Sequence, residues 1–344
     1  MTKRARKAEM IGNLYNVSEE EFGIQTEPYR NELIVHCYRM VGSLQDAEDL
    51  VQETFVRAWN GRRGFEGRAS LRTWLYKIAT NLCLNWLEKR TRRSLPIVRQ
   101  SAASLDEPIP ADINEPIWLE PFPDSLLAST TLDPATRFDQ LENIRLAFLI
   151  ALQQLPPRQR AILILRDVLE WSANEVADLL NISVTAVKSA LFRARTTLSK
   201  RETSFETHSA DNPTDPTLAD RLSQYVYAWE TANVEALVQL LKADATFSMP
   251  PIPSWYQGRG TITGLVSKTI FRGAAQGRWR LLPTRANGET AFGLYRVGEE
   301  ANVHHAYGIQ VVRFQGIEIA DITTFRVPAL FASFGLPMKL VRSE

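Results

Sequence analysis

The strongest constraint on the fold of this chain is an acidic, proline-rich segment that runs from residue 101 to residue 136. It carries six prolines and seven acidic residues, and it has no lysine or arginine. Proline lacks a backbone N–H and interrupts both helices and sheet ladders. The segment therefore predicts an extended acidic linker between folded domains. Its acids are Asp106, Glu107, Asp112, Glu115, Glu120, Asp124 and Asp133.

The length of 344 residues also favours several domains, because a single hydrophobic core rarely exceeds roughly 250–300 residues. A second, shorter linker is predicted at THSADNPTDPT, residues 207 to 217, where prolines and turn-forming residues interrupt the apolar pattern. The predicted organisation is a tail at 1–19, a helical domain at 20–93, the acidic linker region at 94–136, a second helical domain at 137–201, a linker at 202–217 and an α+β domain at 218–344.

The composition excludes several classes of protein. Cys37 and Cys83 are far apart and form no CxxC pair, so neither a disulfide framework nor a zinc site is expected. No apolar segment follows the basic N-terminus, and no uncharged apolar run reaches membrane-spanning length. We therefore expect a cytoplasmic protein with no membrane segment, no metal and no cofactor.

The first domain is predicted to be helical throughout. In SLQDAEDLVQETFVRAWN, Ser43 is a suitable N-cap, and apolar residues recur at the spacing of one buried helix face. The opposite face is acidic. A second helix is predicted to start near Ser70, after the glycine-rich GRRGFEGRAS, and to end in a basic stretch. The residues expected on its buried face are Leu71, Trp74, Leu75, Ile78 and Leu82.

The second domain shows the pattern of a helix-turn-helix. Ser172 and Glu175 form a capping box, Asn181 suits a left-handed helix end, and Ser183 can cap the next helix. That helix would bury Val184, Val187, Leu191, Ala194 and Leu198. Hydroxyl and basic side chains would face outward, and no acid occurs from residue 181 to residue 201. A solvated αα-hairpin is the alternative, but the pattern favours a helix that enters a DNA major groove.

Taken together, these segments resemble bacterial sigma-70 family factors of the extracytoplasmic-function (ECF) group. CYRMVGSLQDAEDLVQETFVRAW and FEGRASLRTWLYKIATNLCLNWLEKRTRR are similar to sigma region 2. ALQQLPPRQRAILILRDVLEWSANEVADLLNISVTAVKSALFRARTTL is similar to region 4. The three patterns occur in the order and spacing of the family.

The resemblance implies that core RNA polymerase is a partner, bound at its β′ clamp helices and its β flap. The residues implied to bind the clamp helices are Asp46, Glu48, Asp49, Gln52 and Glu53. An exposed acidic face fits a basic partner surface. Without the resemblance, a merely solvated face would be the better interpretation. The acidic linker would either thread toward the RNA path of the polymerase or serve as a simple spacer.

The resemblance also implies contacts to promoter DNA. The residues implied at the single-stranded −10 element are Phe65, Arg68, Arg72, Lys77 and Asn81. Amide and guanidinium groups can read the edges of unpaired bases. The residues implied at the double-stranded −35 element are Ser183, Thr185, Lys188, Ser189, Phe192 and Arg193, with Arg158, Arg160 and Arg195 on phosphates. Trp74 and Trp86 are expected in the core.

The third domain is predicted to be α+β, with two helices followed by strands at TAFGLYRV, VHHAYGIQVVRF and IEIADITTFRV. It resembles the SnoaL-like cone fold, whose members enclose an apolar pocket. The candidate lining residues are Tyr225, Trp229, Trp255, Trp279, Phe292, His304 and Asp321. His304 or His305, together with Asp321, could act as general acid and base. Regulatory packing or binding of a small-molecule ligand is the favoured role, and no catalytic residue is assigned.

The predicted fold class is therefore multidomain: two all-α sigma domains followed by an α+β SnoaL-like cone. The predicted function is that of a sigma factor that binds core RNA polymerase and directs promoter recognition, promoter melting and transcription initiation. Its C-terminal domain is predicted to modulate this activity, by docking on the sigma domains or by binding a ligand. Two alternatives stay open. One is a one-component, ligand-sensing DNA-binding regulator, and the other is a SnoaL-like cyclase or isomerase fused to a DNA-binding region.

Overall fold

The structure is a computed structural model, which describes residues 14, 17–67, 69–90, 93–112, 118–128, 144–202, 216–273, 275–298, 300 and 303–341. These residues form two compact units. The helical unit contains the described residues up to Arg93 and those from Ala147 to Glu202. The sheet unit contains residues 94–128, 144–146 and 216–341, as far as these are described. Within the described residues, no helix has both the length and the apolar composition needed to cross a membrane.

The first half of the helical unit is built from helices that begin at serine caps. Ser18 forms a capping box with Glu21, Ser43 accepts from the N–H of Asp46 at 3.1 Å, and Ser70 accepts from Thr73 at 3.1 Å. The helix starts predicted at Ser43 and Ser70 are confirmed. The helices are α2 (Glu19–Thr26), α3 (Arg30–Val41), α4 (Leu44–Gly61) and α5 (Leu71–Glu88), with 3-10 turns at Glu27–Tyr29 and Arg62–Gly64.

The second half of the helical unit consists of short helices and one long one. These are α9 (Leu146–Gln153), α10 (Pro157–Leu163), a π-helical turn η3 (Ile164–Val168), α11 (Ala173–Leu180) and α12 (Val184–Glu202). Proline at the first position of α10 suits a helix start, because the N–H that it lacks would have no partner there. Helix α10 packs against α12, α3 and α5, so the two halves share one core.

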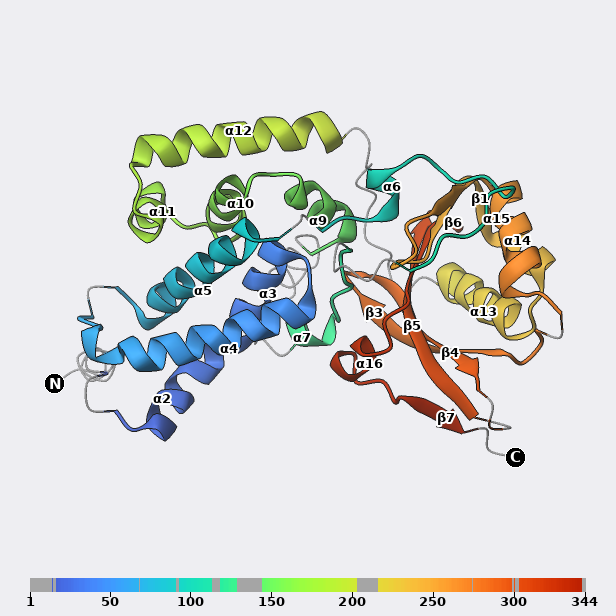
Figure 1. The fold of residues 1–344 in the computed structure, drawn as a ribbon, viewed down its shortest axis with the longest axis horizontal. Helices are drawn as coiled ribbons and strands as arrows, with labels where there is room; N and C mark the ends of the chain where they lie inside the picture. The colour runs from blue at the N-terminus through green and yellow to red at the C-terminus, as the bar shows by residue number, and fades with distance from the viewer. Residues whose placement is uncertain are drawn as a thin grey trace. The chain divides into compact units, whose positions relative to one another are not determined.

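The sheet unit is a curved mixed sheet with helices packed against it (Figure 1). Its helices are α13 (Pro216–Glu230), α14 (Val234–Leu240), α15 (Arg259–Leu265), a π-helical turn η4 (Val266–Ile270) and α16 (Leu330–Ser333). Its strands are β1 (Leu241–Ser248), β2 (Trp255–Gln257), β3 (Trp279–Ala286), β4 (Glu289–Val297), β5 (Val303–Gln315), β6 (Glu318–Phe325) and β7 (Lys339–Val341). The strand order is β2-β1-β6-β5-β4-β3, with β7 on β5. Strands β1 and β6 are parallel, and the other described pairs are antiparallel.

The sequence predicts the main strands of this sheet correctly. Strands β4, β5 and β6 coincide with the three predicted segments, and Gly316 makes the turn between β5 and β6 at φ 63°. The predicted fold class, two helical sigma domains followed by an α+β SnoaL-like cone, is confirmed. The predicted linker at 202–217 lies almost entirely outside the described residues.

The described part of the acidic linker region lies on the sheet unit, where it forms two short helices, α6 (Pro96–Arg99) and α7 (Ser125–Ala128). The indole N–H of Trp255 donates to the carbonyl of Gln100 at 2.7 Å, and the N–H of Ala103 donates to the carbonyl of Trp255 at 2.8 Å. Figure 1 shows this stretch, coloured teal, running from α6 beside β1 and α15. It is therefore hydrogen-bonded to the sheet unit rather than extended in solvent.

The second half of the linker region is held by the turn between β3 and β4. Asn287 lies at that turn in a left-handed conformation, φ 57°. Its side-chain oxygen accepts from the N–H of Phe122 at 2.9 Å, and its amide donates to the carbonyl of Ile144 at 2.6 Å. The buried carboxylate of Asp124 accepts from the N–H of Gly288 at 2.9 Å. One turn thus fixes two segments that are far away in the sequence.

Candidate nucleic-acid interface and cone cavity

Helices α11 and α12 form the predicted helix-turn-helix. The capping box of Ser172 and Glu175 opens α11, and Asn181 ends it in a left-handed conformation, φ 52°. Ser183 then caps α12, because its hydroxyl accepts from the N–H of Ala186 at 3.1 Å. Three of the five residues predicted for the inner face of α12 are buried, namely Val187, Leu191 and Ala194. The local geometry predicted for this motif is confirmed.

The outer face of α12 presents polar and basic side chains to solvent. Thr185, Lys188, Ser189 and Arg193 are exposed, and Phe192 is 72% exposed. A single exposed phenylalanine is common on protein surfaces, so its significance here comes from the basic and hydroxyl side chains beside it on α12. Hydroxyls, ammonium and guanidinium groups and one apolar side chain are the types that contact base edges and thymine methyl groups in the major groove.

The three arginines expected at phosphates lie in different environments. Arg158 is exposed. Arg195 is mostly exposed but pairs with Asp167 at 2.7 Å, and this hydrogen-bonded carboxylate raises the pKa of Arg195. Arg160 is completely buried. Its guanidinium donates to the side chain of Gln153 at 2.5 Å, to the carbonyls of Gln153 and Leu155 at 3.0 and 3.2 Å, and to the carbonyl of Met40.

The assignment of Arg160 to a DNA phosphate therefore disagrees with the structure. A phosphate contact needs an exposed cation, whereas Arg160 ties α10 to the C-terminal end of α3. The segment LPPRQR contains no signal that Arg158 is exposed and that Arg160, two positions later, is buried. Helix periodicity places Arg158 and Arg160 on different faces, but it does not say which face is the inner one in so short a helix.

The acidic face predicted on α4 is present. Glu48, Asp49, Gln52 and Glu53 are exposed, and Glu53 pairs with Arg57 one turn later at 2.7 Å. Asp46 differs from them, because it is half-buried and paired with the buried Arg93. Four of the five predicted polymerase-binding residues thus lie on one accessible surface, and Asp46 also fixes the segment that follows α5.

The residues expected at the −10 element surround the N-terminal part of α5. Phe65 packs on Trp74, with ring centroids 4.9 Å apart. Arg72 pairs with Glu32 at 2.8 Å and lies over the ring of Tyr76. These contacts hold two of the predicted residues against the helical core.

Two more residues of this group are accessible on α5. Asn81 is exposed, and the ammonium group of Lys77 lies 3.4 Å from the backbone carbonyl of Asp178 in α11. Arg68 lies outside the described residues. Asn81 and Lys77 therefore keep polar atoms near the surface of α5. The ammonium group of Lys77 is already hydrogen-bonded within the helical unit.

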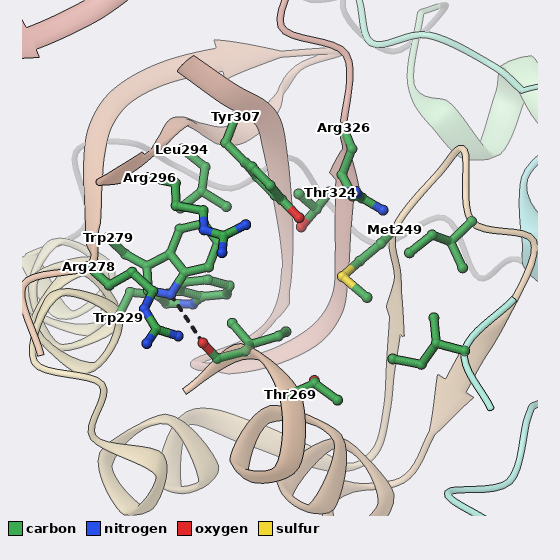
Figure 2. A pocket seen from close by; sticks show the side chains of 13 residues that line it. Trp229, Met249, Thr269, Arg278, Trp279, Leu294, Arg296, Tyr307, Thr324 and Arg326 are labelled. Atoms are coloured by element: carbon green, nitrogen blue, oxygen red, sulfur yellow. Dashed lines mark hydrogen bonds between the residues drawn. The ribbon is translucent and has the colours of Figure 1, made fainter. Parts of the chain in front are cut away.

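The sheet unit contains a cavity of about 200 Å³, called the cone cavity below and drawn in Figure 2. Its walls are aromatic and aliphatic side chains, with arginines at the rim. The lining residues are Ile109, Trp229, Met249, Ile252, Thr269, Ile270, Arg278, Trp279, Leu294, Arg296, Tyr307, Thr324 and Arg326. Of the seven residues predicted to line a pocket, Trp229 and Trp279 do so.

The other five predicted pocket residues do not line the cone cavity. Tyr225 and Phe292 pack on each other in the core, and the Tyr225 hydroxyl donates to Gln310 at 2.7 Å. Burial raises the pKa of Tyr225. The indole of Trp255 bonds to the linker region.

The histidine and aspartate considered as an acid–base pair have separate structural partners. The Nε2 atom of His304 lies 2.8 Å from the carbonyl of Gly277. The Asp321 carboxylate accepts from the hydroxyl of Thr323 at 2.9 Å and from that of Thr246. Neither residue lines the cone cavity.

Comparison with known proteins agrees with the helical unit's architecture. The family model "Sigma-70 region 2" matches residues 26–93, and "Sigma-70, region 4" matches residues 145–198. A Bacillus subtilis protein, RNA polymerase sigma factor YlaC, is 29% identical over 177 residues, which are 51% of this chain and 88% of that protein.

Two further relatives extend over both units. ECF RNA polymerase sigma factor SigG of Mycobacterium tuberculosis is 44% identical over 324 residues, covering 93% of this chain and 85% of SigG. The crystal structure of the M. tuberculosis extracytoplasmic function sigma factor SigJ has the same fold, with a TM-score of 0.57 and 22% identity over 91% of this chain and 99% of that one. The chain therefore belongs to the family of ECF RNA polymerase sigma factors.

Proposed function

We propose that the helical unit binds core RNA polymerase and promoter DNA, and that the sheet unit modulates transcription initiation through the linker region that it holds. The observation that carries the proposal is the separation of charge in the helical unit. One exposed helix face, on α4, is acidic, and another, on α12, is basic, with no acid from Val184 to Arg201. Two surfaces of opposite sign suit two partners of opposite sign.

The acidic face of α4 is proposed to contact the β′ clamp helices. Glu48, Asp49 and Glu53 project from a helix whose other face is fixed in the core, so the carboxylates are presented on a rigid surface. A rigid charged face loses little conformational entropy on binding. The β flap is proposed as a second polymerase contact, through the region 4 half of the helical unit.

The basic face of α12 is proposed to read the −35 element, and the surface of α5 is proposed to meet the single-stranded −10 element. For Lys77 to contact DNA, its hydrogen bond to the carbonyl of Asp178 must open. A long hydrogen bond that is exposed to solvent contributes little net free energy, on the order of 1 kcal/mol, so promoter DNA can compete for it.

The sheet unit is proposed to regulate and not to catalyse. His304 and Asp321 are bonded to separate structural partners, and neither lines the cone cavity. A general acid and base must both reach the reacting atoms. This arrangement favours regulation over the alternative of a cyclase or isomerase fused to a DNA-binding region.

The linker region is proposed to connect the state of the sheet unit with initiation. Its described residues are held by hydrogen bonds to Trp255 and Asn287, so any path of this segment through the polymerase requires release from the sheet unit. A sigma factor acts where RNA polymerase meets the chromosome, and a cytoplasmic location is proposed on that ground.

In vitro transcription with the full chain tests the proposal. Core polymerase, fragmented genomic DNA and the purified protein should give transcripts that start at discrete positions absent with core polymerase alone. A ligand-sensing regulator that acts without core polymerase would bind particular DNA fragments but would give no new start sites, and that result would reject the proposal.

A further inference from the structure

The cone cavity has the shape and wall chemistry of a binding site for a small apolar group. Trp229 and Trp279 meet edge to face, with centroids 5.8 Å apart, and Trp279 meets Tyr307 in the same way at 5.1 Å. Trp229 and Trp279 are almost completely buried. A volume of about 200 Å³ is below the range of roughly 300–1,000 Å³ that is usual for drug-sized ligands. The cavity therefore suits a molecule with a single ring or a short aliphatic chain.

Among the described residues that line this cavity, every charged side chain is an arginine, namely Arg278, Arg296 or Arg326. Figure 2 shows Arg278 and Arg296 on the side of the two indole rings, and Arg326 across the cavity beside Met249. Arg296 lies 5.9 Å above the ring of Trp279, and Arg326 lies 5.4 Å above the ring of Tyr307. Guanidinium groups beside apolar walls favour a ligand that carries a negative charge on an apolar body.

The linker region already places a carboxylate at this rim. Ile109 lines the cavity, and the carboxylate of Asp112 accepts from Arg326 at 3.0 Å. This pair is partly exposed, with side-chain exposures of 25% for Arg326 and 44% for Asp112, so it stabilises the segment only weakly. The Nε of Arg326 is buried without a hydrogen bond to any described residue. A carboxylate that also accepted from the Nε of Arg326 would therefore make more hydrogen bonds to this guanidinium than Asp112 does.

We propose that the cone cavity binds a small apolar carboxylate, an aromatic or short aliphatic acid, whose carboxylate replaces Asp112 on Arg326 and thereby releases the linker segment around Ile109. The inference rests on the proposed function in one respect, because the released segment connects the two sigma regions. The apolar body of the ligand lies against Trp229 and Trp279. Its charge is compensated by Arg326 and Arg296.

A carboxylate is favoured over a phosphate ester because the cavity is small and apolar. Transferring a dianion into such a site costs more free energy than transferring a monoanion, and each charge must be compensated. A neutral molecule would leave the arginines without a partner from the ligand. The ligand chemistry can therefore be tested with three probes that share one ring and differ in charge.

The probes are 4-phenylbutyrate, 4-phenylbutanamide and phenyl phosphate, and binding to the full chain is measured by isothermal titration calorimetry. We expect one 4-phenylbutyrate per chain, with an affinity at least about tenfold higher than that of the amide or the phosphate. Equal affinity for the amide, tighter binding of the phosphate, or no binding of 4-phenylbutyrate at millimolar concentration would overturn the proposal.

Matched variants locate the site. Arg326→Gln and Arg296→Gln should each weaken binding of 4-phenylbutyrate at least about fivefold. Arg272→Gln is the control, because Arg272 is exposed in the same unit and does not line the cavity. Circular dichroism of each variant shows that the fold is retained. Unchanged affinity in both cavity variants would contradict the assignment.

The linker part of the inference has its own test. Asp112→Asn removes the competing carboxylate, so 4-phenylbutyrate should bind several-fold tighter to this variant. In the wild-type chain the ligand should speed hydrogen exchange in the peptide spanning residues 101–112. Binding without faster exchange, or an unchanged affinity in Asp112→Asn, would reject the release of the linker. These measurements contain no polymerase, so their failure is distinct from a failure of the transcription assay.

Discussion

The basic face of α12 and the basic rim of the cone cavity use the same side chains in opposite ways. On α12, Lys188 and Arg193 project outward from a convex helix surface. Around the cone cavity, Arg278, Arg296 and Arg326 surround an apolar hollow, and Arg326 already touches a carboxylate. The first arrangement can meet a row of phosphates at once, whereas the second can hold only one small anion.

The difference between these two basic surfaces shows that the surroundings of an arginine, and not its charge alone, determine which ligand it binds. Contacts to several phosphates release counterions, so their affinity falls steeply as salt concentration rises. A half-buried pair is screened much less. Arg160 represents a third case, since it is fully buried and bonded to backbone carbonyls. Each case predicts a different response to mutation.

The largest effect on stability is expected at Arg160, because this arginine is fully buried whereas those on α12 and at the cavity rim are not. Arg160→Ala removes four hydrogen bonds and leaves buried carbonyls of Met40, Gln153 and Leu155 without this donor. Uncompensated buried polar groups of this kind cost about 3–5 kcal/mol in total. Urea unfolding followed by the helical circular dichroism signal should show that loss in the free energy of unfolding.

Arg158→Ala is the matched control, because Arg158 is exposed and lies two positions away in the same helix. It should change the free energy of unfolding by no more than about 0.5 kcal/mol. Similar effects for the two variants would mean that Arg160 is not the buried link between α10 and α3.

A smaller effect is expected from acid on the helical unit. His36 is fully buried, its Nε2 lies 2.9 Å from the hydroxyl of Thr80, and burial next to Arg39 and Arg72 lowers its pKa from 6.5 to about 3. The unfolded chain binds this proton more readily, so the stability due to neutral His36 is full above pH 6.5 and is lost as the pH falls toward 3. At pH 5 the loss is about 2 kcal/mol relative to pH 8.

His36→Gln isolates this contribution, because glutamine can bond to Thr80 but does not take up a proton. The difference in the free energy of unfolding between pH 8 and pH 5 should be smaller in the variant than in the wild-type chain by about 2 kcal/mol. The same acid sensitivity in both chains would show that His36 is not the group responsible.

The smallest effect is expected on DNA affinity, where it sharpens the contrast between the two basic surfaces. Arg193→Ala should weaken promoter binding by the complex with core polymerase about tenfold and reduce the slope of log affinity against log salt by about one. Arg326→Gln, in the cone cavity, should leave that slope unchanged. Fluorescence anisotropy at a series of salt concentrations measures the slope for both variants. An unchanged slope for Arg193→Ala would show that Arg193 makes no ionic contact with promoter DNA.

The parts of the fold that could be predicted from sequence are those governed by local rules. Caps at Ser43, Ser70 and Ser172 and the apolar spacing of α4 and α12 set the helix starts and the exposed faces, so the acidic and basic surfaces followed from the chain alone. The role of Arg160 did not follow, because its partners come from α3 and from the end of α9.

The cone cavity was predicted only in part for a similar reason. Aromatic content indicated Trp229 and Trp279, but Arg278, Arg296 and Arg326 come from separate parts of the sheet unit and share no sequence pattern. The prolines of the acidic linker region predict an extended segment. The structure instead attaches this region to the sheet unit, through Trp255 and the turn at Asn287. Hydrogen bonds between distant segments leave no periodic signal.

Equilibrium binding of the full chain to core RNA polymerase at low salt is the measurement that tests the central claim most directly. The wild-type chain should bind, the double variant Asp49→Lys, Glu53→Lys should lose most of its affinity, and Glu88→Lys, an exposed acid on α5 outside the acidic face, should bind like the wild type. If the wild-type chain had no affinity, or if the double variant bound as tightly as Glu88→Lys, the acidic surface of α4 would not be the polymerase-binding face.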